Sequence, residues 1–146
     1  MPDKGFLQSD FPIAFAHRGG IQEFPENSLK AFKGAFDLGF RYMETDVHAT
    51  KDGQLVAFHD DRLDRVTNRK GKIAQFNFSD LSSALIGGSE PIPLLVDLLE
   101  ELPDAKFNID PKHDAAVEPL AEIVKRTNSI NRVCIGSFSD NRIKRV

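Results

Sequence analysis

The strongest constraint on the fold is a repeated change of pattern along the chain. Short apolar runs, each followed at once by polar or charged residues, alternate with amphipathic segments of helical spacing. This alternation favours an α/β architecture with a largely parallel sheet, whose strands end along one edge. The runs that we interpret as strands are Ile13–Ala16, Tyr42–Ala49, Leu55–Phe58, Phe107–Asp110 and Val133–Gly136.

The segments between these runs are expected to be mostly helical. Apolar residues at spacings of three and four follow Pro25, where Asn27 or Ser28 can cap a helix that Gly39 ends. The polar and basic stretch over 62–75 is interpreted as a surface loop. Further helices are expected near Ser79, after Pro93, over 115–126 and after Ser139.

The connection between the second and third runs has two interpretations. The Asp52-Gly53 pair favours a tight turn and thus an antiparallel hairpin. A barrel, however, would require the two strands to run parallel. The sequence alone leaves both arrangements open.

Composition excludes several classes of protein. Apolar residues make up 40% and charged residues 28% of the 146 residues, enough for a core and a solvated surface. No apolar run approaches the roughly 18 residues of a membrane span, and no secretory signal is visible, so we expect a cytoplasmic protein without stable membrane insertion. The single Cys134 cannot form an intramolecular disulfide, and a net charge of −3 argues against nucleic-acid binding.

Acidic residues interrupt two of the predicted strands near their carboxyl ends. Glu44 and Asp46 are two positions apart, which places both carboxylates on one strand face, roughly 7 Å apart. Two like charges on an inward face need a neutralising partner, and Mg²⁺ or Ca²⁺ prefers oxygen ligands. Asp110, at the end of a later strand, can supply a third oxygen.

Histidines and cations stand near the same strand ends. His17 and His59 each end an apolar run and can exchange protons near neutral pH, and His48 shares the face of the two carboxylates. Arg18 and Lys112 could hold phosphate oxygens. The Gly19-Gly20 pair would allow close approach of a ligand or simply form a tight turn. Together these groups are suited to metal-assisted hydrolysis of a phosphodiester.

Four segments resemble the glycerophosphodiester phosphodiesterase family: AHRGG at 16–20, PENS at 25–28, ETDVHATKDGQLVAFHD at 44–60 and NIDPK at 108–112. The resemblance covers nearly the whole chain from Ile13 onward. It implies a (β/α)8 TIM-type barrel and hydrolysis of glycerophosphodiesters to sn-glycerol 3-phosphate and an alcohol. It also implies a divalent metal, either Mg²⁺ or Ca²⁺, and a small-molecule substrate from glycerophospholipid head-group breakdown.

The resemblance also implies a role for each matching position. It assigns His17 and His59 to general acid/base catalysis, Glu44, Asp46 and Asp110 to the metal, Arg18 and Lys112 to phosphate binding, and Glu26 and Asn27 to support of the site. The third metal ligand departs from the family's usual glutamate by one methylene. Residues 62–102 match a small subdomain inserted over the barrel mouth, where head-group selection would lie.

The chain is shorter than a complete barrel of this kind. A complete barrel of this type has eight strands and usually about 250 residues. We therefore expect residues 1–146 to cover only about the first five strands and to be incomplete at the C-terminus, or to complete the barrel by self-association. The competing interpretation is a catalytically inactive phosphate-binding or interaction module derived from the same fold.

Overall fold

A computed structural model describes residues 5–20 and 22–146 of the chain. Its main sheet has the order β1 (Phe15–His17), β2 (Tyr42–Ala49), β6 (Lys106–Pro111) and β7 (Val133–Ile135), all parallel. The fifth strand, β3 (Leu55–Ala57), pairs with β2. All five predicted strands are therefore confirmed, although β1 begins at Phe15 instead of Ile13.

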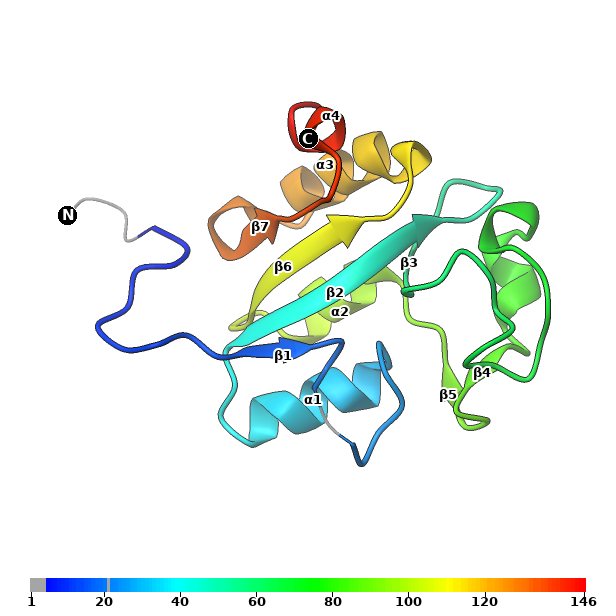
Figure 1. Ribbon diagram of the computed structural model, residues 1–146, viewed down its shortest axis with the longest axis horizontal. Helices are drawn as coiled ribbons and strands as arrows, with labels where there is room; N and C mark the ends of the chain where they lie inside the picture. Colours follow the sequence, from blue (N-terminus) through cyan, green and yellow to red (C-terminus); the bar gives the residue numbers. More distant parts are fainter. Residues whose placement is uncertain (1–4, 21) are drawn as a thin grey trace.

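Helices connect the parallel strands in chain order (Figure 1). They are α1 (Leu29–Asp37), α2 (Leu95–Glu101) and α3 (Val117–Arg126), with 3-10 turns η3 (Asp114–Ala116) before α3 and η4 (Ile130–Arg132) after it. A short helix, α4 (Asp140–Ile143), follows β7. Each new parallel strand is added beside the preceding one, as in a TIM-type barrel. None of the described helices is long and apolar enough to cross a membrane.

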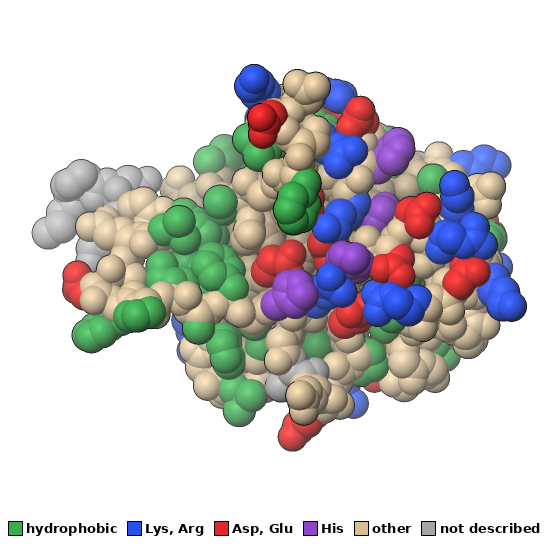
Figure 2. Space-filling view, viewed as in Figure 1, with side chains coloured by type: hydrophobic (Ala, Val, Ile, Leu, Met, Phe, Trp, Pro, Cys, Tyr) green, Lys and Arg blue, Asp and Glu red, His purple; other side chains and the backbone are tan. Residues whose placement is uncertain are grey.

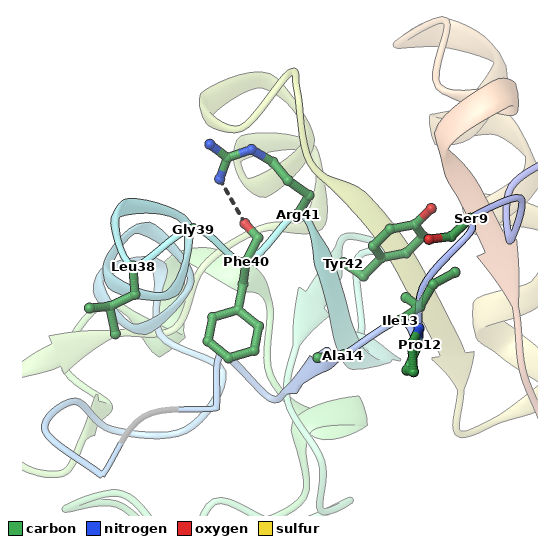
Figure 3. A pocket seen from close by; sticks show the side chains of 9 residues that line it. All are labelled: Ser9, Pro12, Ile13, Ala14, Leu38, Gly39, Phe40, Arg41 and Tyr42. Atoms are coloured by element: carbon green, nitrogen blue, oxygen red, sulfur yellow. Dashed lines mark hydrogen bonds between the residues drawn. The ribbon is translucent and has the colours of Figure 1, made fainter.

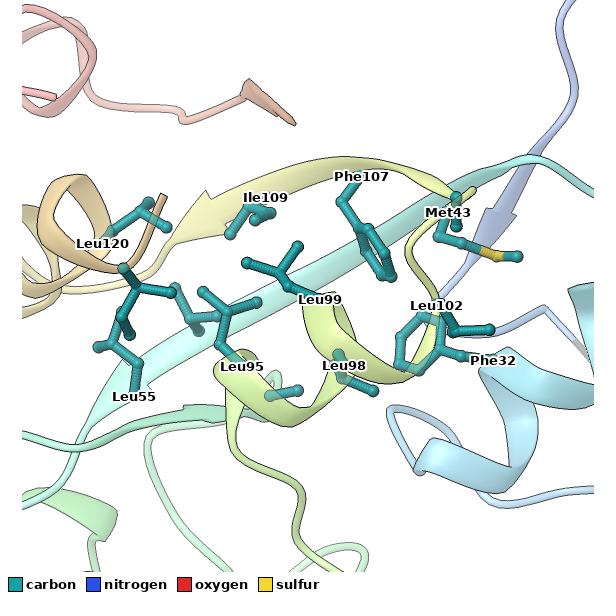
Figure 4. Close-up of a cluster of buried hydrophobic side chains, with 14 of the residues drawn as sticks. Phe32, Met43, Leu55, Leu95, Leu98, Leu99, Leu102, Phe107, Ile109 and Leu120 are labelled. Carbon is teal, nitrogen blue, oxygen red and sulfur yellow. The ribbon is translucent and has the colours of Figure 1, made fainter. Parts of the chain in front are cut away.

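Helices α1, α2 and α3 pack on one face of the sheet and form the main core with it (Figure 4). Alternate residues of β2 and β6, among them Met43, Phe107 and Ile109, point toward the helices and are fully buried. The rings of Phe107 and Phe32 in α1 lie 5.9 Å apart. The residues between them in sequence point to the opposite face, which corresponds to the inside of a barrel.

The first helix begins where the sequence predicts. Ser28 is its N-cap, and the Ser28 Oγ accepts a hydrogen bond from the Ala31 amide at 3.1 Å. Asn27, the other candidate cap, lies just outside the helix with a φ of 58°. The chain leaves the helix through Gly39, whose φ of 102° favours glycine.

The turn at Asp52-Gly53 forms a hairpin. β3 is antiparallel to β2, with Val47 opposite Ala57 and Ala49 opposite Leu55. The amide of Thr50 donates to the carbonyl of Gln54 at 2.9 Å across the turn. The hairpin interpretation is thus confirmed and the parallel one is wrong, which leaves four of the five strands parallel.

The segment after the hairpin has a small core of its own. It contains η1 (Ile73–Gln75), η2 (Phe78–Leu81), β4 (Leu85–Ile86) and β5 (Glu90–Pro91). Its buried side chains are Phe58, Leu63, Ile73, Leu81, Ala84, Ile86 and Ile92, and Val56 of β3 packs with them. We call residues 58–92 the small subdomain, because α2 beyond it packs into the main core.

One predicted cap in this segment is wrong. The helix expected near Ser79 is the short turn η2, and Asn77 occupies its N-cap. The Asn77 amide donates to the Asp80 Oδ2 at 3.1 Å, and Asp80 completes a capping box. Asparagine and serine are equally good caps, so local preference alone does not separate them.

Candidate active site

The predicted acidic residues share the barrel-side face of the sheet. The register places Glu44 beside His17 and Asp46 beside Asp110, each pair on neighbouring parallel strands. Figure 2 shows histidine, basic and acidic side chains interleaved over the carboxyl ends of these strands. The sheet thus brings residues far apart in sequence to one edge, which we call the carboxyl rim.

Two cations occupy the space between the carboxylates. The Lys112 Nζ lies 2.9 Å from Asp46 Oδ1 and donates to Asp110 Oδ2 at 2.7 Å. Arg18 Nε lies 3.5 Å from the other oxygen of Asp46. Burial alone would lower the pKa of Lys112, but the hydrogen bonds to Asp110 and Asp46 outweigh it and raise this pKa. Lys112 is therefore a firmly charged ammonium group.

The carboxylates fit a hard cation in their chemistry. Burial, and then the neighbouring charge of Asp46, raise the pKa of Glu44, so an added positive charge beside it would stabilise its ionised form. Asp46 Oδ2 is buried and has no hydrogen-bond partner among the described residues. Within residues 5–20 and 22–146, however, no three histidine, cysteine or acidic side chains converge as a ready metal-binding group. A metal held by Glu44, Asp46 and Asp110 therefore requires the Lys112 ammonium to move.

A strained turn presents Arg18 to the rim. Its φ is 53°, and its amide donates to the Glu44 carbonyl at 2.9 Å and to Glu44 Oε2 at 3.2 Å. Gly19 continues the turn with a φ of 84°, and a Cβ there would lie 2.7 Å from that of Ala31. The glycine allows the turn to pack against α1, which favours the tight-turn interpretation of the Gly19-Gly20 pair.

Glu26 and Asn27 hold this turn from the other side. The amide of Asn27 donates to the Arg18 carbonyl at 2.9 Å, and its buried Oδ1 accepts from Thr45 Oγ1 at 2.8 Å. Glu26 accepts from Arg18 Nη1 at 3.1 Å. Burial tends to raise the pKa of Glu26, but hydrogen bonds from Arg65 and Arg18 lower it overall.

His17 is the most open member of the group. Its side chain is 69% exposed, and Nε2 lies 3.7 Å from Glu44 Oε2. With Arg18, Gly20, Gln22 and Glu26 it lines a cavity of about 310 Å³. An imidazole in this position can reach a bound small molecule.

His59 reaches the rim by a different route from the one the sequence suggests. Its strand is antiparallel, so the rule that parallel strands end at one edge does not apply to it. Instead β2 extends beyond the rim, and the hairpin returns until the Phe58 amide donates to the Asp46 carbonyl at 2.9 Å. His48, whose pKa burial lowers, lies 2.9 Å through Nε2 from the His59 carbonyl. We therefore assign His48 to support of His59.

Two charged residues of this site were missed at the sequence level. Asp60 Oδ1 lies 2.7 Å from His59 Nδ1, and Arg65 Nε donates to Asp60 Oδ2 at 2.7 Å. Both stand in a polar stretch that is typical of a solvated loop. The signal that could have found Asp60 is its position beside His59 in the resembling segment 44–60, whereas Arg65 lies beyond the four resembling segments.

A second pocket lies at the amino ends of β1 and β2 (Figure 3). It has a volume of about 370 Å³, and its lining includes Pro12, Ile13, Leu38 and Phe40. The one hydrogen bond drawn there joins Arg41 Nη1 to the Phe40 carbonyl. This lining offers no pair of proton-exchanging groups, so the carboxyl rim is the stronger candidate site.

Comparison with known proteins identifies the family of the chain. Residues 17–145 match the glycerophosphoryl diester phosphodiesterase family. A Mycobacterium tuberculosis protein named "Probable glycerophosphodiester phosphodiesterase 2" is 45% identical over 145 residues, covering 99% of this chain and 55% of that protein.

Solved structures share the fold. The crystal structure of a glycerophosphodiester phosphodiesterase from Agrobacterium tumefaciens superposes with a TM-score of 0.86 at 28% identity, covering 92% of this chain and 61% of that one. A phosphodiesterase from Oleispira antarctica, solved in complex with the product sn-glycerol-3-phosphate, gives 0.84 at 26% identity, covering 91% and 60%. The chain thus spans between 55% and 61% of the lengths of these three proteins. It belongs to the glycerophosphoryl diester phosphodiesterase family and has the fold of part of its TIM-type barrel.

Proposed function

We propose that the protein hydrolyses glycerophosphodiesters to sn-glycerol 3-phosphate and an alcohol. The observation that carries the proposal is the carboxyl rim, where an imidazole, three carboxylates and two cations lie in contact: His17, Glu44, Asp46, Asp110, Arg18 and Lys112. A cavity opens beside His17 and Arg18. Family membership and the relatives' names support the same reaction. The bound product of the Oleispira antarctica enzyme supports this substrate class.

A divalent cation, Mg²⁺ or Ca²⁺, completes this site in the proposal. Glu44, Asp46 and Asp110 would hold it, and Asp46 offers a buried oxygen without a partner in the described part of the chain. When bound, such an ion withdraws negative charge from the phosphate. Lys112, once displaced from Asp46, would remain near enough to neutralise a phosphate oxygen as a point charge.

The two histidines divide the proton transfers. One imidazole takes the proton of the attacking hydroxyl as the new phosphorus–oxygen bond forms. The other gives a proton to the leaving alkoxide as its bond to phosphorus breaks. The attacking group is water or, in an alternative, the glycerol 2-hydroxyl, which forms a cyclic phosphate that water then opens to sn-glycerol 3-phosphate. Arg18 orients the phosphate through its planar guanidinium.

Three further assignments belong to this proposal. The insertion matched over residues 62–102 contacts the head group through the part that precedes α2, because α2 packs into the main core. The protein acts in the cytoplasm, which suits the single Cys134. It associates with itself if a barrel has to be completed from two copies, an outcome that light scattering would detect.

The test is an assay with glycerophosphocholine and either cation, with and without a chelator. We expect release of sn-glycerol 3-phosphate that the chelator abolishes and the cation restores. Binding of the diester without turnover would instead support the inactive module, and turnover that ignores the chelator would contradict the metal assignment.

A further inference from the structure

The most connected charged side chain near the rim belongs to the small subdomain. Arg65 donates through Nε to Asp60 Oδ2 at 2.7 Å and through Nη2 to Asp60 Oδ1 at 3.0 Å. The same Nη2 donates to Glu26 Oε1 at 2.5 Å. One guanidinium therefore joins two carboxylates that stand in separate loops. A planar group with five donors suits such a bridge, which a lysine ammonium reproduces poorly.

One arm of the bridge ends on a predicted catalytic imidazole. The hydrogen bonds from Arg65 are the largest cause that lowers the pKa of Asp60 to about 2, so this carboxylate is ionised at neutral pH. It lies 2.7 Å from His59 Nδ1. An ionised carboxylate accepts a hydrogen bond, which favours the tautomer with the proton on Nδ1. Nε2 is then the nitrogen that exchanges a proton with a substrate.

The other arm ends on the predicted phosphate ligand. Glu26, held by Arg65, accepts from Arg18 Nη1 at 3.1 Å. Arg18 Nε in turn lies 3.5 Å from Asp46 Oδ2. Contacts thus run from the small subdomain to a carboxylate that we assign to the metal.

The small subdomain is packed in a way that holds this bridge in place. Gly87 has a φ of 60°, and a Cβ there would lie 2.6 Å from Pro25 Cγ. Its amide donates to the Val66 carbonyl, next to Arg65, at 2.8 Å. The loop that carries Glu26 and the loop that carries Arg65 therefore approach each other through a close glycine contact.

From these contacts we infer that Arg65 is a positioning residue that fixes His59 through Asp60 and Arg18 through Glu26 at the same time. The inference rests on the proposed hydrolysis and adds a task for the small subdomain, which orients both sides of the site. Arg65 itself does not touch the reacting atoms in this account.

The test compares Arg65→Gln with Arg62→Gln. Arg62 is a matched control, because its side chain is 48% exposed against 49% for Arg65, and it pairs with Asp64 at 3.2 Å. We expect Arg65→Gln to lower kcat/KM about 10- to 100-fold, the range for groups that orient active-site side chains. Arg65→Lys should fall between wild type and Arg65→Gln. Equal effects of Arg62→Gln and Arg65→Gln would overturn the inference.

A second readout does not depend on turnover. Nitrogen NMR of the histidine side chains reports which ring nitrogen carries the proton, and His59→Asn identifies the signal of His59. We expect the Nδ1-protonated fraction of His59 to fall in Arg65→Gln and to stay unchanged in Arg62→Gln. An unchanged tautomer in folded Arg65→Gln would overturn the inference, even if kcat/KM fell.

Two controls separate the possible failures. If Arg65→Gln does not fold, Asp60→Asn tests the same link from its partner and should shift the tautomer in the same direction. If the wild-type protein does not hydrolyse the diester, the proposed function fails. The tautomer comparison still decides the role of Arg65.

Discussion

The two ends of the barrel-side face are built from the same strands but differ in how far the hydrogen bonds of their polar groups are satisfied. At the amino ends Phe15, Tyr42 and Lys106 stand side by side in register. The Tyr42 hydroxyl donates to the Phe6 carbonyl at 2.9 Å, and the Lys106 Nζ donates to the same carbonyl at 3.1 Å. These polar atoms are satisfied, and the aromatic rings pack around them.

Around the carboxyl rim, several buried polar atoms have no hydrogen-bond partner among the residues that the structure describes. Four such side-chain atoms occur in the described part of the chain: Arg18 Nε, Asn27 Nδ2, Asp46 Oδ2 and Asn108 Oδ1. A buried polar atom without a hydrogen bond is rare in folded proteins and costs stability. The polar groups at the amino ends are thus satisfied within the chain, whereas the rim holds buried polar atoms that the proposed cation and substrate would satisfy.

The largest effect should come from removing either imidazole at the rim. We expect His17→Ala and His59→Ala each to lower kcat on the order of 10²–10⁴, as general acid/base groups usually do. Tyr42→Phe, at the opposite end, should leave kcat within about twofold of wild type. Near-normal turnover by either alanine variant would remove that histidine from the mechanism.

Glu44→Gln should separate cation binding from stability. The raised pKa of Glu44 reflects burial and repulsion from Asp46, so a neutral amide relieves both. We expect the free energy of unfolding in chelator to rise by about 1 kcal/mol. Calorimetry should show Mg²⁺ or Ca²⁺ binding weakened by at least about tenfold, since a hard cation prefers carboxylate oxygen. A loss of stability without a change in cation affinity would contradict the assignment of Glu44 to cation binding.

Tyr42→Phe should act at the amino ends alone. It removes the hydroxyl that donates to the Phe6 carbonyl and accepts from Lys106 Nζ at 3.2 Å. We expect the free energy of unfolding to fall by about 1 kcal/mol, the usual net contribution of such a bond. Urea titration measures this change. A fall in kcat beyond about twofold in folded Tyr42→Phe would contradict the separate roles of the two ends.

The smallest effect concerns acid stability at the rim. The pKa of Asp60 is lowered from 3.8 to about 2 by its hydrogen bonds with Arg65. A lowered pKa means that ionised Asp60 stabilises the fold above pH 3.8, and this contribution is lost as the pH falls toward 2. The difference in unfolding free energy between wild type and Asp60→Asn should therefore shrink as the pH falls through this range. A difference independent of pH would show that the charge of Asp60 does not stabilise the fold.

The sequence predicts the carboxylates of the carboxyl rim well, because strand periodicity and parallel register determine where they lie. Alternation along β2 places Glu44 and Asp46 on one face, and parallel pairing then brings Asp110 beside Asp46. Local capping likewise predicts Ser28. These features depend on neighbours within a few residues or on a regular ladder.

What the sequence does not predict depends on tertiary contacts. His59 reaches the rim only because the hairpin folds back along β2, and the turn alone leaves two arrangements open. Arg65 gains its role from Glu26, 39 positions earlier in the chain. A charged residue in a polar stretch carries no local sign of such a partner.

The most direct test of the central claim, that the carboxylates of the rim hold a cation for diester hydrolysis, is a cation titration of sn-glycerol 3-phosphate release by wild type and Asp46→Asn. The account predicts that turnover of the wild type rises with Mg²⁺ or Ca²⁺ and saturates, whereas Asp46→Asn needs at least about tenfold more cation or shows no response. Identical cation dependence in both proteins would contradict it.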